Sequence, residues 1–166
     1  MAINLSKGDN VSFSRSLTNV CVGLGWDPNE GAGHEYDLDA SAFMLGHNGH
    51  LITDEFFVFY NNQLSPDGAV QSTGDDQTGR NSEEGDDETL MVDLAKVDPR
   101  VQEILFTATI YKAEERRQNF GQVSNAYIRI YNSTNEEEIA RYDLNEDFSV
   151  ETAVEFGRLY RSFGEW

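Results

Sequence analysis

Apolar residues recur at every second position along much of this chain, and this alternation constrains the fold more than any other feature of the sequence. Successive side chains of a β-strand point to opposite faces, so a period of two predicts strands with one packed face. Many of these residues are β-branched or aromatic, which favours strands further. The runs that predict strands are Val20–Trp26, Leu38–Met44, Phe56–Tyr60, Leu90–Leu94, Ile104–Tyr111, Ala126–Tyr131 and Glu138–Leu144.

Turn-forming residues separate these runs and indicate the class of fold. The stretches Asn48-Gly49, Ser65–Gly68 and Asn132–Asn135 consist of residues that favour chain reversal. Many short strands joined by such turns are typical of two packed sheets. The sequence therefore predicts an all-β fold, a β-sandwich of two mainly antiparallel sheets.

One or two short helices are expected beside the sheets. Asp98 can cap a helix over Asp98–Gln102, and Pro99 suits the first helical position. The segment that begins near Ser149 fits a helix and a strand about equally well, so its structure stays open at this point.

The length of 166 residues fits a single domain over residues 1–166. A chain of this size can bury about two thirds of the surface that its unfolded form exposes, so it needs no cofactor simply to make a core. No repeat or linker divides it. The stretch Ser162–Gly164 resembles a hairpin turn without a return strand, and we expect the domain to be truncated at its C-terminus.

The composition is strongly acidic, with 30 Asp and Glu residues against 12 Lys and Arg residues and a formal net charge of −18. Such a charge repels phosphate backbones, so we expect no direct binding of nucleic acid. No apolar run is long enough to span a membrane, and the N-terminus lacks the pattern of a signal peptide. Cys21 is the single cysteine, which excludes an intrachain disulfide framework. Together these features predict a cytoplasmic protein.

Negative charge is concentrated in the stretch from Asp75 to Glu88, which holds seven acidic residues and one base, Arg80. Glycines on either side of Arg80 allow the backbone to fold carboxylates and carbonyls inward around a point. Flexible loops that offer oxygen ligands suit Ca²⁺ better than Mg²⁺, because Ca²⁺ accepts irregular geometry and Mg²⁺ keeps its waters. A solvated acidic loop is the alternative for such a run of charge.

Two aspartates in a predicted strand favour the cation site. Asp37 and Asp39 are two positions apart, so their carboxylates should project from the same face, about 7 Å apart. Such a pair opposes burial unless a positive charge joins it. Asp27, directly after the run Val20–Trp26, is a further candidate at a strand end. The acidic stretch does not fit the EF-hand spacing, since Arg80 or Met91 would occupy the position of the required glycine.

Other chemistries have weaker support in the sequence. His34, His47 and His50 offer imidazoles without a cysteine pair, and the last two flank a turn. Cys21 alternates with apolar neighbours and is expected to be a packed residue. Paired acids can hydrolyse glycosides, but neighbours on one strand such as Asp37 and Asp39 do not face each other across a sugar.

Ordered blocks of residues along nearly the whole chain resemble the TerD family of tellurite-resistance and general stress proteins. The resemblance implies a β-sandwich that binds two Ca²⁺ ions at adjacent sites, with no enzymatic activity established for the family. The blocks are Gly25–Asp27, Asp37–Phe43, Phe57–Asn62, Ser65–Gly68, Thr73–Gly79, Gly85–Glu88, Gln118–Gly121 and Arg141–Leu144. The residues assigned to the metal sites are Asp27, Asp37, Asp39, Asp75, Asp76, Asp86, Asp87 and Glu88.

Two positions depart from the family pattern: Asp76 stands where the family usually has Asn, and Glu84 replaces a more usual Gly or Asp. The favoured hypothesis is a Ca²⁺-binding module of the stress response. It would assemble with other stress or tellurite-resistance proteins, in one version at the inner membrane surface. A metal-assisted hydrolase that uses the same carboxylates is the alternative. Direct binding of a tellurium oxyanion ranks last, because the net charge repels anions.

Overall fold

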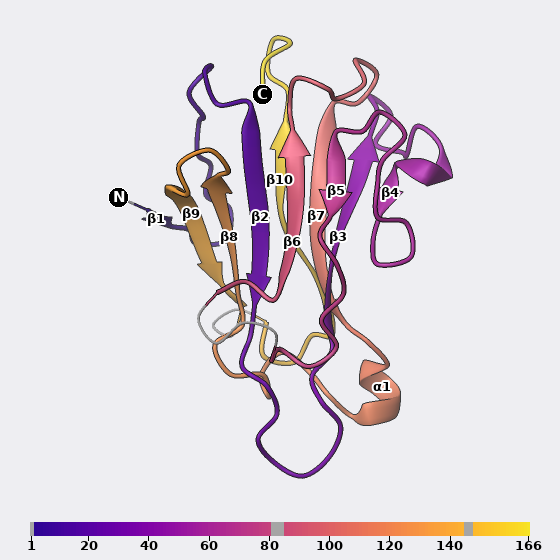
Figure 1. Cartoon of the computed structure of the whole chain (residues 1–166), viewed down its shortest axis with the longest axis vertical. Coiled ribbons are helices and arrows are strands. Elements are labelled where there is room, and N and C mark those ends of the chain that lie inside the picture. The colour runs from indigo at the N-terminus through magenta and orange to yellow at the C-terminus, as the bar shows by residue number, and fades with distance from the viewer. Residues whose placement is uncertain (1, 81–84, 145–147) are drawn as a thin grey trace.

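Two β-sheets packed face to face form the body of the molecule in the computed structural model, which describes residues 2–80, 85–144 and 148–166 (Figure 1). One sheet has the strand order β1-β9-β8-β2-β6-β5 and the other β10-β7-β3-β4. The elements are β1 (Ile3–Asn4), β2 (Asn19–Gly25), β3 (Leu38–Leu45), the 3-10 helix η1 (Asp54–Phe56), β4 (Phe57–Val58), β5 (Val70–Ser72), β6 (Glu88–Asp93), β7 (Glu103–Ile110), α1 (Ala113–Arg116), β8 (Tyr127–Asn132), β9 (Glu138–Asp143) and β10 (Ala153–Tyr160). The predicted all-β sandwich is confirmed.

The pairing of the strands is antiparallel throughout the described residues except between β1 and β9. At the centre of the six-stranded sheet, Val22 of β2 lies opposite Leu90 of β6 and Ile130 of β8. In the other sheet, Ala40 of β3 lies opposite Ala108 of β7. This register turns every second side chain of each central strand toward the space between the sheets.

The core lies between the sheets and follows the alternation of the sequence. Along β7, half-buried and fully buried residues alternate over all eight positions. Ile104 and Phe106 of this strand pack in one cluster with Val22 and Leu90 of the opposite sheet. Each such side chain contributes about 1.5–3 kcal/mol when fully buried, so the two inner faces hold the sandwich together.

The helix predicted over Asp98–Gln102 is wrong. The N–H of Val101 donates to the carbonyl of Asp98 (2.9 Å) and closes one turn. The next N–H, that of Gln102, donates to the carbonyl of Leu45 at the end of β3 (2.7 Å). The chain has therefore already joined the sheet where a helix would need its second turn, and β7 begins one residue later.

The strand predicted over Phe56–Tyr60 is shorter in the structure. Phe56 ends η1, and only Phe57 and Val58 form a strand. The side chain of Asn62 donates to the carbonyl of Phe57 (2.6 Å), so a side chain takes the place of a ladder partner. The segment after Ser149, which the sequence left open, is the strand β10, paired antiparallel with β7.

β3 pairs with β7 along its whole length, but the short β4 leaves the first part of its other edge without a neighbouring strand. β4 pairs with β3 only at Ala42 and Phe43, whereas β3 begins at Leu38. On that side the backbone N–H of Ala40 donates instead to the carboxylate of Glu88 from the other sheet (2.8 Å). This unpaired half-edge is where the acidic residues gather.

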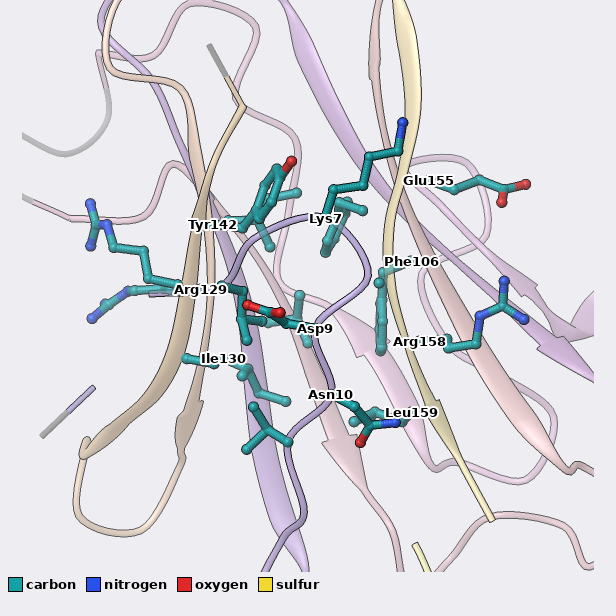
Figure 2. A pocket seen from close by; sticks show the side chains of 18 of the residues that line it. Lys7, Asp9, Asn10, Phe106, Arg129, Ile130, Tyr142, Glu155, Arg158 and Leu159 are labelled. Atoms are coloured by element: carbon teal, nitrogen blue, oxygen red, sulfur yellow. The ribbon is translucent and has the colours of Figure 1, made fainter. Parts of the chain in front are cut away.

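An apolar groove of about 500 Å³ lies on the opposite side of the sandwich, between β8, β9 and β10. Phe106 and Tyr142 line it from the two sheets, and the N-terminal segment that carries Asp9 and Asn10 runs across it (Figure 2). In the four-stranded sheet, β7 lies between β10 at the groove and β3 at the acidic half-edge.

Candidate metal centre

Three carboxylates converge beside the start of β3. One oxygen each of Asp37, Asp39 and Asp75 lie within 4.8 Å of one another. Asp37 and Asp39 alternate with the core-facing Leu38, so they share one face of the strand, as their spacing predicts. Both are buried, while Asp75 is exposed and comes from the segment that follows β5.

One carboxylate oxygen of Asp37 has no hydrogen-bond donor within the described part of the chain. The Oδ1 atom of Asp37 is buried and finds no hydrogen-bond partner among the described residues. Leaving a buried acceptor unsatisfied costs about 1–3 kcal/mol, and more when the group is charged. A cation at this point would supply the missing interaction for Asp37 together with Asp39 and Asp75.

The raised pKa values within the cluster also favour a bound cation. Burial, with the Asp37 and Asp75 carboxylates added to it, raises the pKa of Asp39 to about 7. Burial also raises the pKa of Asp37, and the charge of Asp75 adds to the effect while Arg116 opposes it. The carboxyl groups of Asp37 and Asp39 are thus hard to ionise at this place, which is the condition that a bound cation reverses.

Glu88 joins the two sheets at the edge of this cluster. It is the first residue of β6, and its Oε2 atom accepts the N–H of Ala40 in β3 (2.8 Å). Its Oε1 atom accepts the N–H of Asp76 (3.2 Å), so the same side chain holds the segment that carries Asp75. Burial raises the pKa of Glu88 to about 8, with Asp39 and Asp75 contributing and the two N–H donors opposing.

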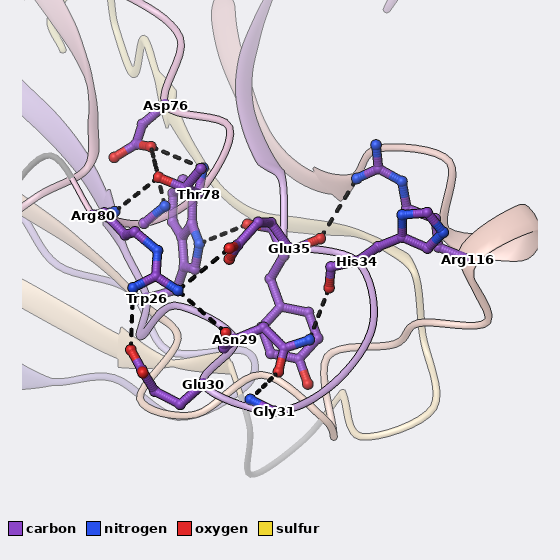
Figure 3. A network of polar contacts seen from close by, with 12 residues as sticks. Trp26, Asn29, Glu30, Gly31, His34, Glu35, Asp76, Thr78, Arg80 and Arg116 are labelled. Atoms are coloured by element: carbon purple, nitrogen blue, oxygen red, sulfur yellow. Dashed lines mark hydrogen bonds and ion pairs between the residues drawn. The ribbon is translucent and has the colours of Figure 1, made fainter.

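Asp76 is buried and stabilises the turn that follows Asp75. It is 2% exposed, and its Oδ1 atom accepts the backbone N–H groups of Thr78 (2.9 Å) and Gly79 (3.0 Å). These bonds fold the chain back immediately after Asp75 (Figure 3). The arrangement makes Asp76 a structural support of the loop through that oxygen.

Asp86 and Asp87 point away from the three-carboxylate cluster. Both oxygens of Asp86 contact the guanidinium of Arg129 on β8, at 2.8 and 2.9 Å, and the hydroxyl of Tyr127 donates to one of them (3.0 Å). The Oδ2 atom of Asp87 accepts the N–H of Trp26 (2.9 Å). The structure therefore directs these two acidic residues to β8 and to the end of β2.

Asp27 also lies apart from the cluster. It is exposed, and its Oδ2 atom accepts a hydrogen bond from the side chain of Asn125 (2.7 Å). Of the eight residues assigned from the sequence, the structure brings Asp37, Asp39 and Asp75 together, with Asp76 and Glu88 as their supports. Glu83 and Glu84 of the acidic stretch lie outside the described residues.

Arg80, the one base of the acidic stretch, ties that stretch to the loop after β2. Its guanidinium contacts the carboxylates of Glu30 and Glu35 and donates to the carbonyl of Asn29, each at 3.3 Å (Figure 3). The indole N–H of Trp26 donates to the carbonyl of Tyr36 (3.0 Å) in the same region. The two loops are thus held as one unit beside the cluster.

Two further oxygens near Asp37 were not predicted from the sequence. Oε2 of Glu35 and Oε1 of Gln118 are buried and have no hydrogen-bond partner among the described residues. The amide group of Gln118 donates to the carbonyls of His34 (3.0 Å) and Glu35 (3.1 Å), which fixes it against this segment. Glu35 lies two positions before Asp37 and continues its i, i+2 series, a signal that was present in the sequence.

The other candidate chemistries find little support in the geometry. His34, His47 and His50 are exposed, and the last two flank a turn at the end of β3 that is closed by the N–H of Gly46 and the carbonyl of His50 (2.9 Å). Cys21 is buried in β2, and burial raises the pKa of its thiol. The donor set beside β3 consists of carboxylate oxygens, which suits a hard cation.

The fold and this site define an all-β sandwich protein with an acidic cluster at an unpaired sheet edge. The TerD domain family model matches residues 1–166, and the chain belongs to this family. It is 53% identical over 169 residues to a tellurium resistance protein TerD of Serratia marcescens, covering 100% of this chain and 87% of the relative. It is 48% identical over 170 residues to general stress protein 16U of Bacillus subtilis, covering 100% of this chain and 87% of the relative.

Solved structures agree with the architecture. A crystal structure of a protein of unknown function matches with a TM-score of 0.77 at 23% identity, over 90% of this chain and 85% of that one. At this identity the likeness concerns the fold alone. The names of the two curated relatives refer to resistance and stress and to no catalysed reaction. In the described part of the chain, no helix has the length and apolarity needed to cross a membrane.

Proposed function

We propose that this chain is a Ca²⁺-binding module of the stress response and that Asp37, Asp39 and Asp75 hold a calcium ion. Two observations on Asp37 carry the proposal: its buried Oδ1 atom has no hydrogen-bond donor among the described residues, and one of its oxygens lies within 4.8 Å of oxygens of Asp39 and Asp75. Repulsion among these groups becomes attraction once a divalent cation lies between them.

Calcium fits this site better than other common cations. Its ligands are oxygens, and one of them comes from an exposed loop residue, Asp75, rather than from a rigid strand. Ca²⁺ accepts six to eight oxygens in irregular geometry, whereas Mg²⁺ requires a near octahedron and gives up its water reluctantly. Zinc and copper sites use imidazole or thiolate ligands, and His34, His47 and His50 are exposed outside the cluster.

The ion would act on the surface as well as on the site. Glu88 holds the segment of Asp75 and Asp76 at one point and Arg80 ties it to the loop after β2, so a cation bound to Asp75 would add a further fixed point to the acidic loop. A partner protein would then meet a defined surface in place of a repelling one. We propose that the partners are other stress or tellurite-resistance proteins in the cytoplasm, in one version at the inner membrane surface, and not nucleic acid.

A second calcium ion is part of the proposal, because the resemblance to the TerD family implies two adjacent sites. The three-carboxylate cluster accounts for one ion. Oε2 of Glu35 and Oε1 of Gln118, which have no hydrogen-bond partner in the described ranges, lie in the same region and offer acceptors for additional coordination, directly or through water. The stoichiometry of binding decides this point.

The metal-assisted hydrolase is the less favoured alternative. The relatives are named for resistance and stress. A hydrolase also needs a base beside the metal that is not itself used as a ligand or a structural support. Glu88 is the nearest candidate, but both its oxygens accept backbone N–H groups. We therefore propose a binding protein and not an enzyme.

Calorimetric titration of the metal-free protein with Ca²⁺ and with Mg²⁺ tests the proposal. We expect Ca²⁺ to bind with a stoichiometry of one or two ions and to be preferred over Mg²⁺. Thermal melts should show stabilisation that grows with the concentration of Ca²⁺, about 2.7 kcal/mol at a hundredfold excess over Kd. Absence of heat and of any shift in the melting temperature at millimolar Ca²⁺ would remove the proposed function.

A further inference from the structure

The ion pair between Asp86 and Arg129 lies on the outer face of the six-stranded sheet and does not belong to the three-carboxylate cluster. The guanidinium meets the carboxylate with two of its nitrogens, Nε at 2.8 Å and Nη2 at 2.9 Å. The Asp86 side chain is only 5% exposed, so the pair is largely withdrawn from water. Two parallel bonds of this kind fix orientation as well as distance.

The six-stranded sheet leaves space for the Asp86 carboxylate on its outer face. Gly23 of β2 lies directly beneath it, and a Cβ atom there would stand 2.1 Å from Oδ2 of Asp86. Arg129 contacts Asp86 from the neighbouring strand β8, and its guanidinium also stacks over the ring of Tyr131 at 4.6 Å. Tyr131 and Glu138 thus hold the arginine in place in addition to Asp86.

The side chains of three consecutive acidic residues, Asp86, Asp87 and Glu88, point in different directions. Asp86 turns outward to Arg129, and Asp87 accepts the N–H of Trp26 at the end of β2. Glu88 turns inward, where it accepts the N–H groups of Ala40 in β3 and of Asp76 in the loop. The ladder with β2 pairs Glu88 with Leu24, and the contact of Asp86 with Arg129 fixes the chain immediately before this strand end, from which the side chain of Glu88 reaches the segment that carries Asp75.

We infer that Arg129 is a positioning residue for the cation site: it anchors Asp86 on the outer face, and the anchored arm places Glu88 and the Asp75 segment beside β3. Arg129 itself does not contact the ion. This inference rests on the proposed binding of Ca²⁺ and assigns to that binding a residue on the opposite face of the sheet.

The sign of the effect separates positioning from simple electrostatics. Loss of the positive charge of Arg129 makes the protein more negative, so Coulomb attraction alone predicts tighter binding of Ca²⁺. Loss of stability alone predicts a lower melting temperature with the affinity unchanged. Only a positioning role predicts weaker binding, because the ligand segment loses its anchor.

The experiment measures the Kd for Ca²⁺ of wild type, Arg129→Gln, Arg129→Lys and Arg158→Gln by calorimetry, well below the melting temperature of each. Arg158→Gln is the matched control, since Arg158 pairs with Glu103 between β10 and β7 (3.2 Å) and has no contact with the acidic arm. We expect Arg129→Gln to weaken binding about tenfold, as changes in residues that orient metal ligands do. Arg129→Lys keeps the positive charge but cannot make the two parallel bonds, so it should lose less Ca²⁺ affinity than Arg129→Gln. It keeps the test valid if the glutamine variant folds poorly.

Hydrogen exchange in the metal-free proteins gives a second readout. The amides of Ala40 and Asp76, which Glu88 accepts, should exchange faster in Arg129→Gln than in Arg158→Gln. If wild type binds Ca²⁺ and Arg129→Gln binds equally well or more tightly, the positioning role is overturned and the proposed function stands. If wild type binds no Ca²⁺, the proposed function fails and the role of Arg129 fails with it.

Discussion

The carboxylate of Glu88 in β6 accepts the backbone N–H of Ala40 in β3 at 2.8 Å, and this bond joins the two sheets of the sandwich. It occupies the part of the β3 edge that faces away from β7 and that β4 leaves open, because β4 pairs only at Ala42 and Phe43. The other oxygen of Glu88 accepts the N–H of Asp76. One buried side chain therefore satisfies the sheet edge and holds the loop of the proposed calcium site.

Substitution Glu88→Gln is expected to destabilise the metal-free protein by about 1–3 kcal/mol. The amide NH₂ of glutamine cannot accept, so one of the two N–H groups loses its partner in a buried place. Urea unfolding in the presence of a chelator measures the change. Glu155→Gln in β10 is the matched control, since Glu155 is exposed, and it should stay within about 0.5 kcal/mol of wild type. Equal unfolding midpoints for the two variants would contradict the bridging role.

Much of the fold follows from the alternation of the sequence. The runs around Val22, Ala40 and Phe106 became β2, β3 and β7 with the inner faces that a period of two requires. The pattern is decisive there because these strands are central and long. It fails at the ends, where a two-residue strand such as β4 leaves no period to detect.

The helices were not predictable from local signals. The helix α1 lies between Lys112 (φ 51°) and Arg117 (φ 55°), both in the left-handed region without being glycine or asparagine. At Asp98 the usual signals of a helix start are present, but the N–H of Gln102 donates to the carbonyl of Leu45 in β3, so the segment does not continue as a helix. The tertiary hydrogen bond of Gln102 therefore overrode the local helix signals at Asp98.

The candidate site was predictable in part. The spacing of Asp37 and Asp39 is visible in the sequence, and the structure brings Asp75 to them. The partner of Asp86 could not be predicted from the sequence, because a carboxylate near a strand end can bind a metal ion or pair with an arginine equally well. Its signal was Arg129 itself, a cation between Tyr127 and Tyr131 on one face of β8, which requires an opposite charge nearby.

Substitution Asp39→Asn is expected to weaken Ca²⁺ binding at least about tenfold, because it removes a buried charged ligand from a set of three. Asp143→Asn, an exposed aspartate of β9, makes the same chemical change far from the site and should leave the Kd within about twofold. Asp27→Asn should resemble the control, since Asp27 bonds to Asn125 outside the cluster. Calorimetric titration measures all three. A Kd for Asp27→Asn that rises as much as that of Asp39→Asn would place Asp27 among the ligands instead.

Cys21 is expected to react with thiol reagents at least about a hundredfold more slowly in the native protein than in urea, because it must first be exposed by opening of the structure. Burial raises the pKa of its thiol, so the native reaction should also begin at higher pH than that of the unfolded chain. Stopped-flow measurement with a chromogenic disulfide between pH 7 and pH 9 gives both rates. Equal rates would show an accessible thiol and would revive direct chemistry between this residue and tellurium oxyanions.

Substitution Gly79→Ala tests how the loop of the site is held against the sandwich. Gly79 has a φ of +70°, and a Cβ atom there would lie 2.5 Å from Nε1 of Trp26. Two costs therefore add: the left-handed backbone, about 1–2 kcal/mol, and displacement of a buried indole, about 1–3 kcal/mol. Gly49→Ala is the matched control, since Gly49 has a φ of +74° with nothing within 4 Å of the added atom, and it should show the backbone cost alone.

The two costs of Gly79→Ala have different spectroscopic consequences. Displacement of Trp26 breaks the bond from its indole N–H to the carbonyl of Tyr36, so the fluorescence of the folded protein should change in Gly79→Ala and not in Gly49→Ala. The same shift moves the turn that Asp76 stabilises immediately after Asp75, and binding of Ca²⁺ should weaken with it. A Gly79→Ala protein that matches Gly49→Ala in stability, fluorescence and Kd would mean that the loop does not rest on Trp26 in solution.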